Sequence, residues 1–121
     1  MIAVSDSSPL IGLSRIGCLD LLARIFETVY ISAEVYDEVV LVGAGRPGAE
    51  SVALAPWIRV KPVQSLADLE KAIEETGLGS GEVSAVQLAR ELGIAVVLID
   101  ERRARFYAEA ARPPFGLHAT T

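Results

Sequence analysis

The chain begins Met1-Ile-Ala-Val-Ser-Asp-Ser-Ser-Pro-Leu10, a short apolar run that a single acid interrupts. Ile2 to Val4 predict a buried strand, and Ser7-Ser8-Pro9 predict the start of a helix, because proline is favoured in the first helical turn. Asp6 therefore lies where a strand ends and a helix begins. In α/β sheets this is the usual place for ligand chemistry.

Strands and helices alternate along the rest of the chain. The expected strands are Ile2–Ser5, Thr28–Ile31, Trp57–Val60 and Ile94–Ile99, the third of them at a sheet edge because Pro56 and Pro62 flank it. The expected helices run from Pro9 to about Phe26, with a break near Gly12 or Gly17, and over Ala33–Val42, Glu50–Ala55, Leu66–Thr76, Glu82–Leu92 and Glu101–Ala111. This alternation predicts one α/β domain over residues 1–121, with a parallel central sheet in a three-layer arrangement.

Composition narrows the class of protein. Apolar residues make up 51% of the 121 residues, yet no uninterrupted apolar run approaches the ~20 residues that span a bilayer. The chain shows no signal peptide, and its single cysteine, Cys18, excludes an internal disulfide framework. We therefore expect a cytoplasmic protein with no membrane partner. A net charge of −5 argues against indiscriminate binding to nucleic acid, but metal ions in an acidic cleft can supply positive charge locally.

A second acid, Asp100, ends the strongest strand signal in the sequence, Ile94–Ile99. If this strand and the first one are neighbours, Asp6 and Asp100 converge on one crevice. Like charges brought that close are costly unless a proton or a cation lies between them. The simplest interpretation is an acidic metal site.

Spacing leaves two interpretations open for each of two further acids. Glu82 heads the apolar stripe of its helix, with Ser84 expected on the opposite side, so it is either a site residue or a first-turn acid that complements the helix dipole. Glu38 shares a helix with Glu34 and Asp37, which could be plain solvated charges on the helix face. By pattern alone Glu38 could be solvated as well.

The ordered set of short motifs resembles the PIN-domain family, most closely the small prokaryotic PIN-like proteins often found beside an antitoxin-like partner. The segments cover about residues 1–107 and all occur in family order. They are Val4-Ser-Asp-Ser-Ser-Pro-Leu-Ile-Gly-Leu13, Ile31-Ser-Ala-Glu-Val-Tyr-Asp-Glu38, Arg46-Pro-Gly-Ala49, Pro56-Trp-Ile-Arg-Val60, Gly77-Leu-Gly-Ser-Gly-Glu82-Val-Ser-Ala85 and Val97-Leu-Ile-Asp-Glu-Arg-Arg-Ala104.

The resemblance implies a PIN-like α/β/α fold and metal-dependent hydrolysis of RNA, with an antitoxin protein as partner. The family's catalytic and metal-binding acids fall on Asp6, Glu38, Glu82 and Asp100, and Ser7 matches the small hydroxyl residue that follows the first acid. Carboxylates without paired His or Cys suit Mg²⁺ or Mn²⁺ and point away from zinc.

The last part of the chain departs from the family. Arg102 and Arg103 are candidates to bind a substrate phosphate, with surface salt bridges as the competing interpretation. Relatives usually continue with a fifth strand, a Gly-Thr turn and a further helix, whereas Phe115–Thr121 begins that strand and then stops. We therefore expect the domain to lack its final strand or helix and to form a homodimer through the uncovered surface.

Three other functions compete with the nuclease interpretation. A receiver domain requires paired acids after the first strand and a late lysine, and an aspartyl phosphatase requires Asp-x-Asp there, whereas this chain has Asp6-Ser7-Ser8. A catalytically weak PIN-like binding or assembly module remains the alternative to a nuclease, because the sequence alone does not distinguish the two.

Overall fold

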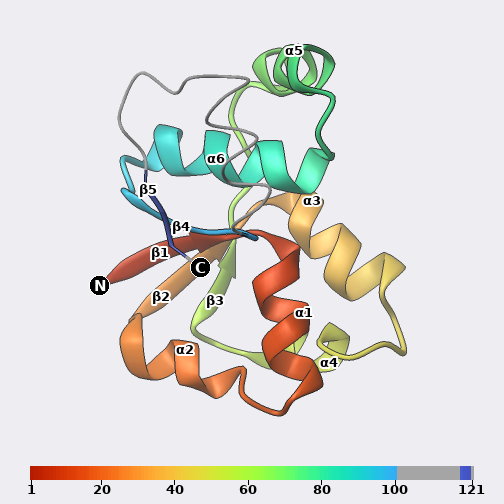
Figure 1. Cartoon of the computed structure of the whole chain (residues 1–121), viewed down its shortest axis with the longest axis vertical. Coiled ribbons are helices and arrows are strands. Elements are labelled where there is room, and N and C mark those ends of the chain that lie inside the picture. Colours follow the sequence, from red (N-terminus) through yellow and green to blue (C-terminus); the bar gives the residue numbers. More distant parts are fainter. Residues whose placement is uncertain (101–117, 121) are drawn as a thin grey trace.

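The protein has an α/β fold built on an all-parallel sheet in the order β3-β2-β1-β4-β5 (Figure 1). The computed structural model describes residues 1–100 and, as a strand only, residues 118–120. The strands are β1 (Ile2–Ser5), β2 (Thr28–Ile31), β3 (Ile58–Val60), β4 (Val96–Leu98) and β5 (His118–Thr120).

The first and fourth strands are neighbours, which confirms the condition for convergence of their ends. Val4 pairs with Val97 and Ser5 with Leu98. β3 lies at one edge of the sheet, as its flanking prolines predicted. At the other edge, β5 pairs with β4 from His118 onward, so the strand expected from Phe115 is present over three residues.

Helices connect the strands, and none of those described is long and apolar enough to cross a membrane. They are α1 (Ser7–Arg15), α2 (Asp20–Ile25), α3 (Ala33–Tyr36), α4 (Ala49–Leu54), α5 (Leu66–Thr76) and α6 (Ser80–Leu92), with a π-helix, η1 (Asp37–Val42), directly after α3. Gly17 separates α1 from α2, because its φ of +70° is left-handed and ends a helix. The predicted helix over Glu101–Ala111 lies outside the described residues.

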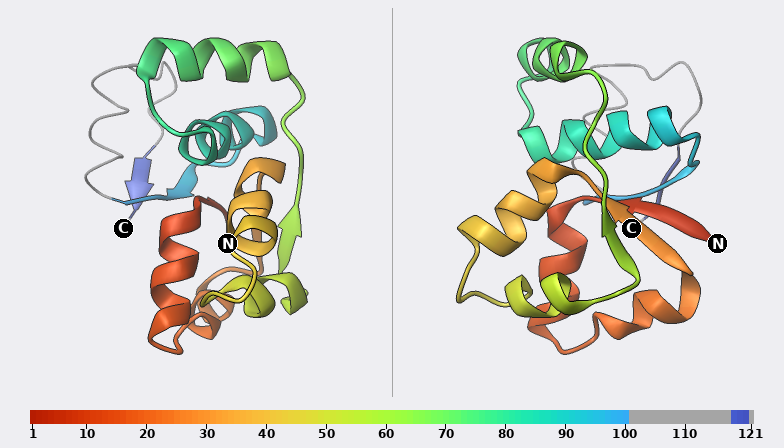
Figure 2. Two further views of the ribbon diagram at one scale, coloured as in Figure 1. Left: turned by 90° about the vertical axis from the view of Figure 1, so that its right-hand side faces the viewer. Right: turned by 180° about the vertical axis from the view of Figure 1, so that it is seen from behind.

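The sheet divides the core into two, because successive residues of a strand face opposite sides. Ala3 packs on the side of α1, α2, α3 and α4, whereas its neighbour Val4 packs on the side of α5 and α6. Figure 2 shows the sheet between these two groups of helices. The expected three layers, PIN-like α/β/α with a parallel central sheet, are therefore confirmed.

Helix α6 lies between α5 and the sheet, and α3 packs against it as well (Figure 1). Because α6 has neighbours on several sides, its first ten residues are almost all buried. The prediction that Ser84 faces away from the core was wrong: Ser84 is 0% exposed. A single apolar stripe is a poor guide to a helix that is covered on more than one side.

Candidate functional site

Asp6 connects β1 to α1 at the carboxyl edge of the sheet. Its backbone N–H donates to the Leu98 carbonyl over 2.9 Å, which anchors it beside the end of β4. The residue is 2% exposed, and its carboxylate does not cap α1 although it stands at the N-cap position. Its Oδ1 atom lies beside Gly81, at the start of α6.

Three oxygen atoms converge on Gly81, in the first turn of α6. A Cβ atom at Gly81 would lie 3.2 Å from Glu38 Oε2, 3.3 Å from Asp6 Oδ1 and 3.6 Å from Ser7 Oγ. Because Asp6 Oδ1 and Glu38 Oε2 both lie so close to the same point, the two carboxylate oxygens are also close to each other. The structure therefore brings Asp6 and Glu38 together, which spacing alone did not decide for Glu38.

Ser7 is the third member of this group. The residue is 2% exposed, and its Oγ has no hydrogen-bond partner among the residues that the structure describes. A buried hydroxyl is normally hydrogen-bonded, and an exception needs an explanation such as a bound water or ion. The direction of Ser7 towards the two carboxylates makes it a candidate to bind such a ligand.

Glu82 and Asp100 approach the same edge from other elements. Glu82 follows Gly81 in the first turn of α6 and is 8% exposed, so it is far more buried than a carboxylate that only complements the helix dipole needs to be. Asp100 comes two residues after Leu98 and is exposed. Arg102 and Arg103 lie outside the described residues.

The helix that carries Glu38 differs from expectation in two ways. The predicted α-helix over Ala33–Val42 widens into the π-helix η1 at Asp37, one residue before Glu38, and such π-turns are frequent at functional sites. Asp37 is exposed as expected, but Glu34 is half-buried. Its Oε1 is buried without a hydrogen-bond partner within the described part of the chain, so Glu34 is not a fully solvated charge.

The donor atoms fit a hard divalent cation. Asp6, Glu38 and Ser7 offer oxygen only, which suits Mg²⁺ or Mn²⁺ and not zinc. Within residues 1–100 no three acidic, histidine or cysteine side chains are grouped closely enough to hold a metal ion. Mg²⁺ is commonly held by one or two carboxylates together with several waters, so the Asp6–Glu38 pair is sufficient.

Two residues beside this site, Gly81 and Ser84, are not identifiable as site residues from the pattern of apolar residues in the sequence. The expected helix begins at Glu82, but Ser80 and Gly81 already belong to α6. Ser84 makes a buried hydrogen bond to Ser32, the N-cap of α3, with 2.7 Å between the two hydroxyl oxygens. The available signal was the spacing of Gly81 and Ser84, two small residues three apart that share a helix face.

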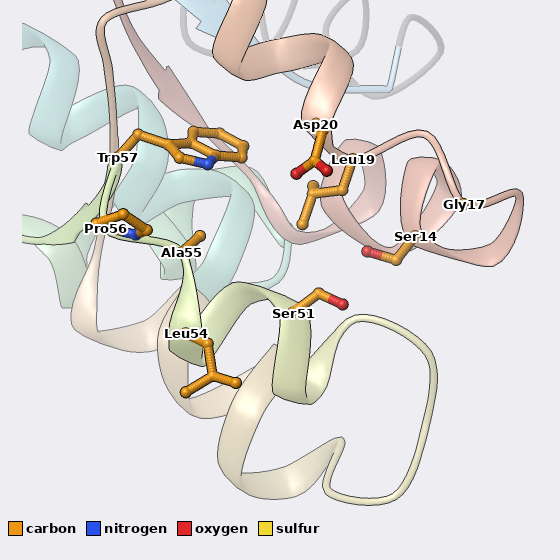
Figure 3. A pocket seen from close by; sticks show the side chains of 9 residues that line it. All are labelled: Ser14, Gly17, Leu19, Asp20, Ser51, Leu54, Ala55, Pro56 and Trp57. Carbon is orange, nitrogen blue, oxygen red and sulfur yellow. The ribbon is translucent and has the colours of Figure 1, made fainter.

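A separate pocket of about 380 Å³ lies at the opposite end of the sheet (Figure 3). Trp57 lines it directly before β3 begins, whereas Asp6 follows the end of β1, so the pocket is not part of the acidic site. Its other lining residues are Ser14, Gly17, Leu19, Asp20, Ser51, Leu54, Ala55 and Pro56. No sequence pattern predicts this pocket.

A comparison with protein families gives one informative result. A family model described as a PIN domain matches residues 2–113, nearly the whole chain. No curated protein and no solved structure shows significant similarity to the chain.

Proposed function

The chain belongs to the PIN-domain family, whose fold is of the nuclease type, and from this we propose that it is a metal-dependent endoribonuclease. The observation that supports the proposal best is the convergence of Asp6 Oδ1 and Glu38 Oε2 beside Gly81. Asp6 is buried and Glu38 is exposed, and two carboxylates this close from different elements repel each other unless a cation offsets their charge. A divalent cation is the simplest partner that does so and also activates water.

The acids would hold the cation, and the other residues would position the substrate. Bound Mg²⁺ or Mn²⁺ lowers the pKa of an attacking water and offsets the negative charge of the phosphate. Asp6 and Glu38 would be ligands, with Glu82 and Asp100 as the further catalytic acids at the same edge. The Ser7 hydroxyl would donate to a phosphate oxygen or to a water molecule.

The proposal extends to partners in the cell. We propose RNA as the substrate, with Arg102 and Arg103 binding its phosphates, and a role as the toxin of a toxin–antitoxin pair in the cytoplasm. An acidic chain of net charge −5 gains no general attraction to RNA. Substrate binding would therefore depend on the metal ion and on these local arginines, and should be lost when the ion is removed.

An RNA cleavage assay on the purified chain tests the proposal. We expect cleavage in Mg²⁺ or Mn²⁺, none in EDTA, and a loss of roughly 100-fold or more in Asp6→Asn, the scale at which removal of one charge-stabilising group is felt. Glu82→Gln should also lower the rate. Asp20→Asn is the matched control, because Asp20 is an exposed acid that lines the far pocket.

Two outcomes would contradict the nuclease assignment. Robust cleavage by an Asp6→Asn, Asp100→Asn double variant would mean that the activity comes from another site or a contaminant. No cleavage with either metal would favour the alternative, a catalytically weak PIN-like binding or assembly module. The observation that favours the binding or assembly module is that no three metal-ligating side chains group together within residues 1–100.

A further inference from the structure

We propose that Gly81 is a positioning residue of the acidic site, held in place by a buried chain of hydrogen bonds that runs from Ser32 through Ser84. The proposal rests on the proposed function in one respect, namely that the Asp6–Glu38 pair binds a divalent cation. Gly81 would keep the space beside the two carboxylates open, and the hydrogen-bond chain would prevent α6 from moving away.

The lack of space for a Cβ atom, and not a special backbone conformation, explains why residue 81 is glycine. Gly81 is not among the glycines with positive φ, so alanine could adopt its conformation. Alanine is normally the more favourable residue in a helix. A Cβ at 3.2 Å from Glu38 Oε2 and 3.3 Å from Asp6 Oδ1 is, however, tighter than nine in ten contacts of real Cβ atoms. One or both carboxylates would have to shift by a few tenths of an ångström.

The hydrogen-bond chain has a defined direction. The Val35 N–H donates to Ser32 Oγ over 3.0 Å, and Ser84 Oγ donates to the Gly81 carbonyl over 3.0 Å. Because a hydroxyl has one proton and a carbonyl can only accept, the Ser84 proton is committed to Gly81. Ser32 must therefore donate across the 2.7 Å that separates it from Ser84 Oγ.

The hydrogen-bond chain through Ser32 and Ser84 joins the two helical segments that carry site residues. Ser32 caps α3, which leads directly into η1 and Glu38, whereas Gly81 and Ser84 belong to the start of α6 beside Glu82. Both serines are 0% exposed, so water cannot replace these bonds without a rearrangement. An alanine at position 81 would therefore displace the carboxylates and not the helix.

Gly79 supplies a matched comparison two residues earlier. A Cβ there would meet only Glu82 Oε1 at 3.5 Å, an ordinary van der Waals contact. Its φ of −68° and ψ of 154° are open to alanine. Gly79→Ala and Gly81→Ala therefore make the same chemical change in the same segment. They differ in how closely neighbouring oxygen atoms approach the new Cβ atom.

Calorimetric titration of the full chain with Mn²⁺ alone is the first measurement. We expect Gly81→Ala to bind Mn²⁺ about tenfold or more weakly than wild type, the loss typical of residues that orient metal ligands, and Gly79→Ala to bind like wild type. Equal affinities for the two alanine variants would overturn the proposal. Failure of wild type to bind Mn²⁺ would instead contradict the proposed function, and the second measurement then decides the role of Gly81.

The second measurement is a double-mutant cycle on unfolding in metal-free buffer, with Glu38→Asp as the partner change. The shorter side chain withdraws the carboxylate from position 81, so Gly81→Ala should destabilise the Glu38→Asp chain less than wild type. The cycle also covers a Gly81→Ala chain that does not fold, because Glu38→Asp should then restore folding. Additive effects, or no restoration, would overturn the proposal.

Discussion

The backbone N–H of Asp6 donates to the carbonyl of Leu98 over 2.9 Å. Ser5 and Leu98 are the last paired residues of β1 and β4, and this bond follows directly after them. It fixes the Asp6 backbone next to Leu98, and Asp100 comes two residues after Leu98 at the same edge of the sheet. The two acids that the sequence singled out therefore follow neighbouring strands. The backbone of Asp6 is anchored at this edge by the hydrogen bond to Leu98, and Asp100 follows two residues after the end of β4.

Neutralising Asp6 should change stability in opposite directions with and without metal. In metal-free buffer, Asp6→Asn removes one of two nearby negative charges, so the free energy of unfolding should rise by on the order of 1 kcal/mol, or roughly 4 °C in Tm. Saturating Mn²⁺ should stabilise wild type, by about 2.7 kcal/mol at 100 times Kd, and have little effect on the variant. Calorimetric melting with and without Mn²⁺, with Asp20→Asn as control, measures both; equal Mn²⁺ stabilisation of Asp6→Asn and wild type would exclude Asp6 as a ligand.

Removal of the Ser84 hydroxyl should destabilise the fold. Ser84→Ala leaves the buried Ser32 hydroxyl without its acceptor, and a buried polar group left unpaired costs about 1–3 kcal/mol. Denaturant unfolding measures this loss. Ser51→Ala, an exposed serine of the far pocket, should stay within about 0.5 kcal/mol of wild type. Equal stability of both variants would mean that the serine chain does not hold α3 against α6.

Local sequence signals predicted the elements well where one signal dominated. β1, β2 and α5 have the predicted boundaries, because each is a clean apolar or amphipathic pattern between turn signals. β4 is shorter than predicted, Val96–Leu98, since pairing with neighbours and not hydrophobicity decides where a strand ends. The π-helix after Tyr36 had no signal, because its hydrogen-bond shift depends on packing.

The site could be predicted only in part for the same reason. Asp6 was identifiable from its place between a strand and a helix. Its position beside β4 follows once β1 and β4 are known to be neighbouring strands. The approach of Glu38 depends on the route of α3 and η1 over the sheet, which no local pattern encodes. Ser84 was misassigned because it is a polar residue buried by a specific partner, Ser32, 52 positions away in sequence.

Two glycines in open space should respond to alanine with opposite signs. Neither Gly12 nor Gly93 has an atom within 4 Å of a new Cβ. Gly12 lies inside α1, so Gly12→Ala should stabilise by about 0.5–1 kcal/mol. Gly93 caps α6 with a φ of +69°, so Gly93→Ala should destabilise by about 1 kcal/mol. Denaturant unfolding of the pair measures the contrast, and a change of the same sign in both would contradict it.

We propose that the protein forms a homodimer, with the region from Ala104 to Leu117, which lies outside the described residues, at or near the interface. β5 is a three-residue strand at the edge of the sheet as described, and edge strands offer unpaired backbone groups to another chain. Two-fold pairing is the commonest way to cover such an edge. Light scattering at micromolar concentration should give the mass of two chains; a monomer with normal melting would contradict the prediction.

The Glu91 carboxylate fastens α6 to the segment between β3 and α5. It accepts the backbone N–H of Gln64 over 2.8 Å and that of Ser65 over 3.4 Å, and the Gln87 amide donates to it over 3.0 Å. Burial raises the pKa of Glu91, but the hydrogen bonds from Gln87, Gln64 and Ser65 together lower it by more than burial raises it. The net pKa of Glu91 is therefore below its ordinary value of 4.5.

The lowered pKa of Glu91 makes a pH-dependent contribution to stability. The folded chain holds the charged form more strongly than the unfolded chain does, so the contribution is complete above the unfolded pKa of about 4.5 and is lost as pH falls through the lower folded pKa. Glu91→Gln should therefore reduce the free energy of unfolding at pH 7, by about 1 kcal/mol for a partly exposed carboxylate. The difference from wild type should shrink steadily below pH 4.5. Urea unfolding of both chains from pH 7 to pH 3 measures it, with Glu74→Gln on the exposed face of α5 as the control. A difference that stays constant over this range would show that the effect of the Glu91 substitution is one of shape and not of charge.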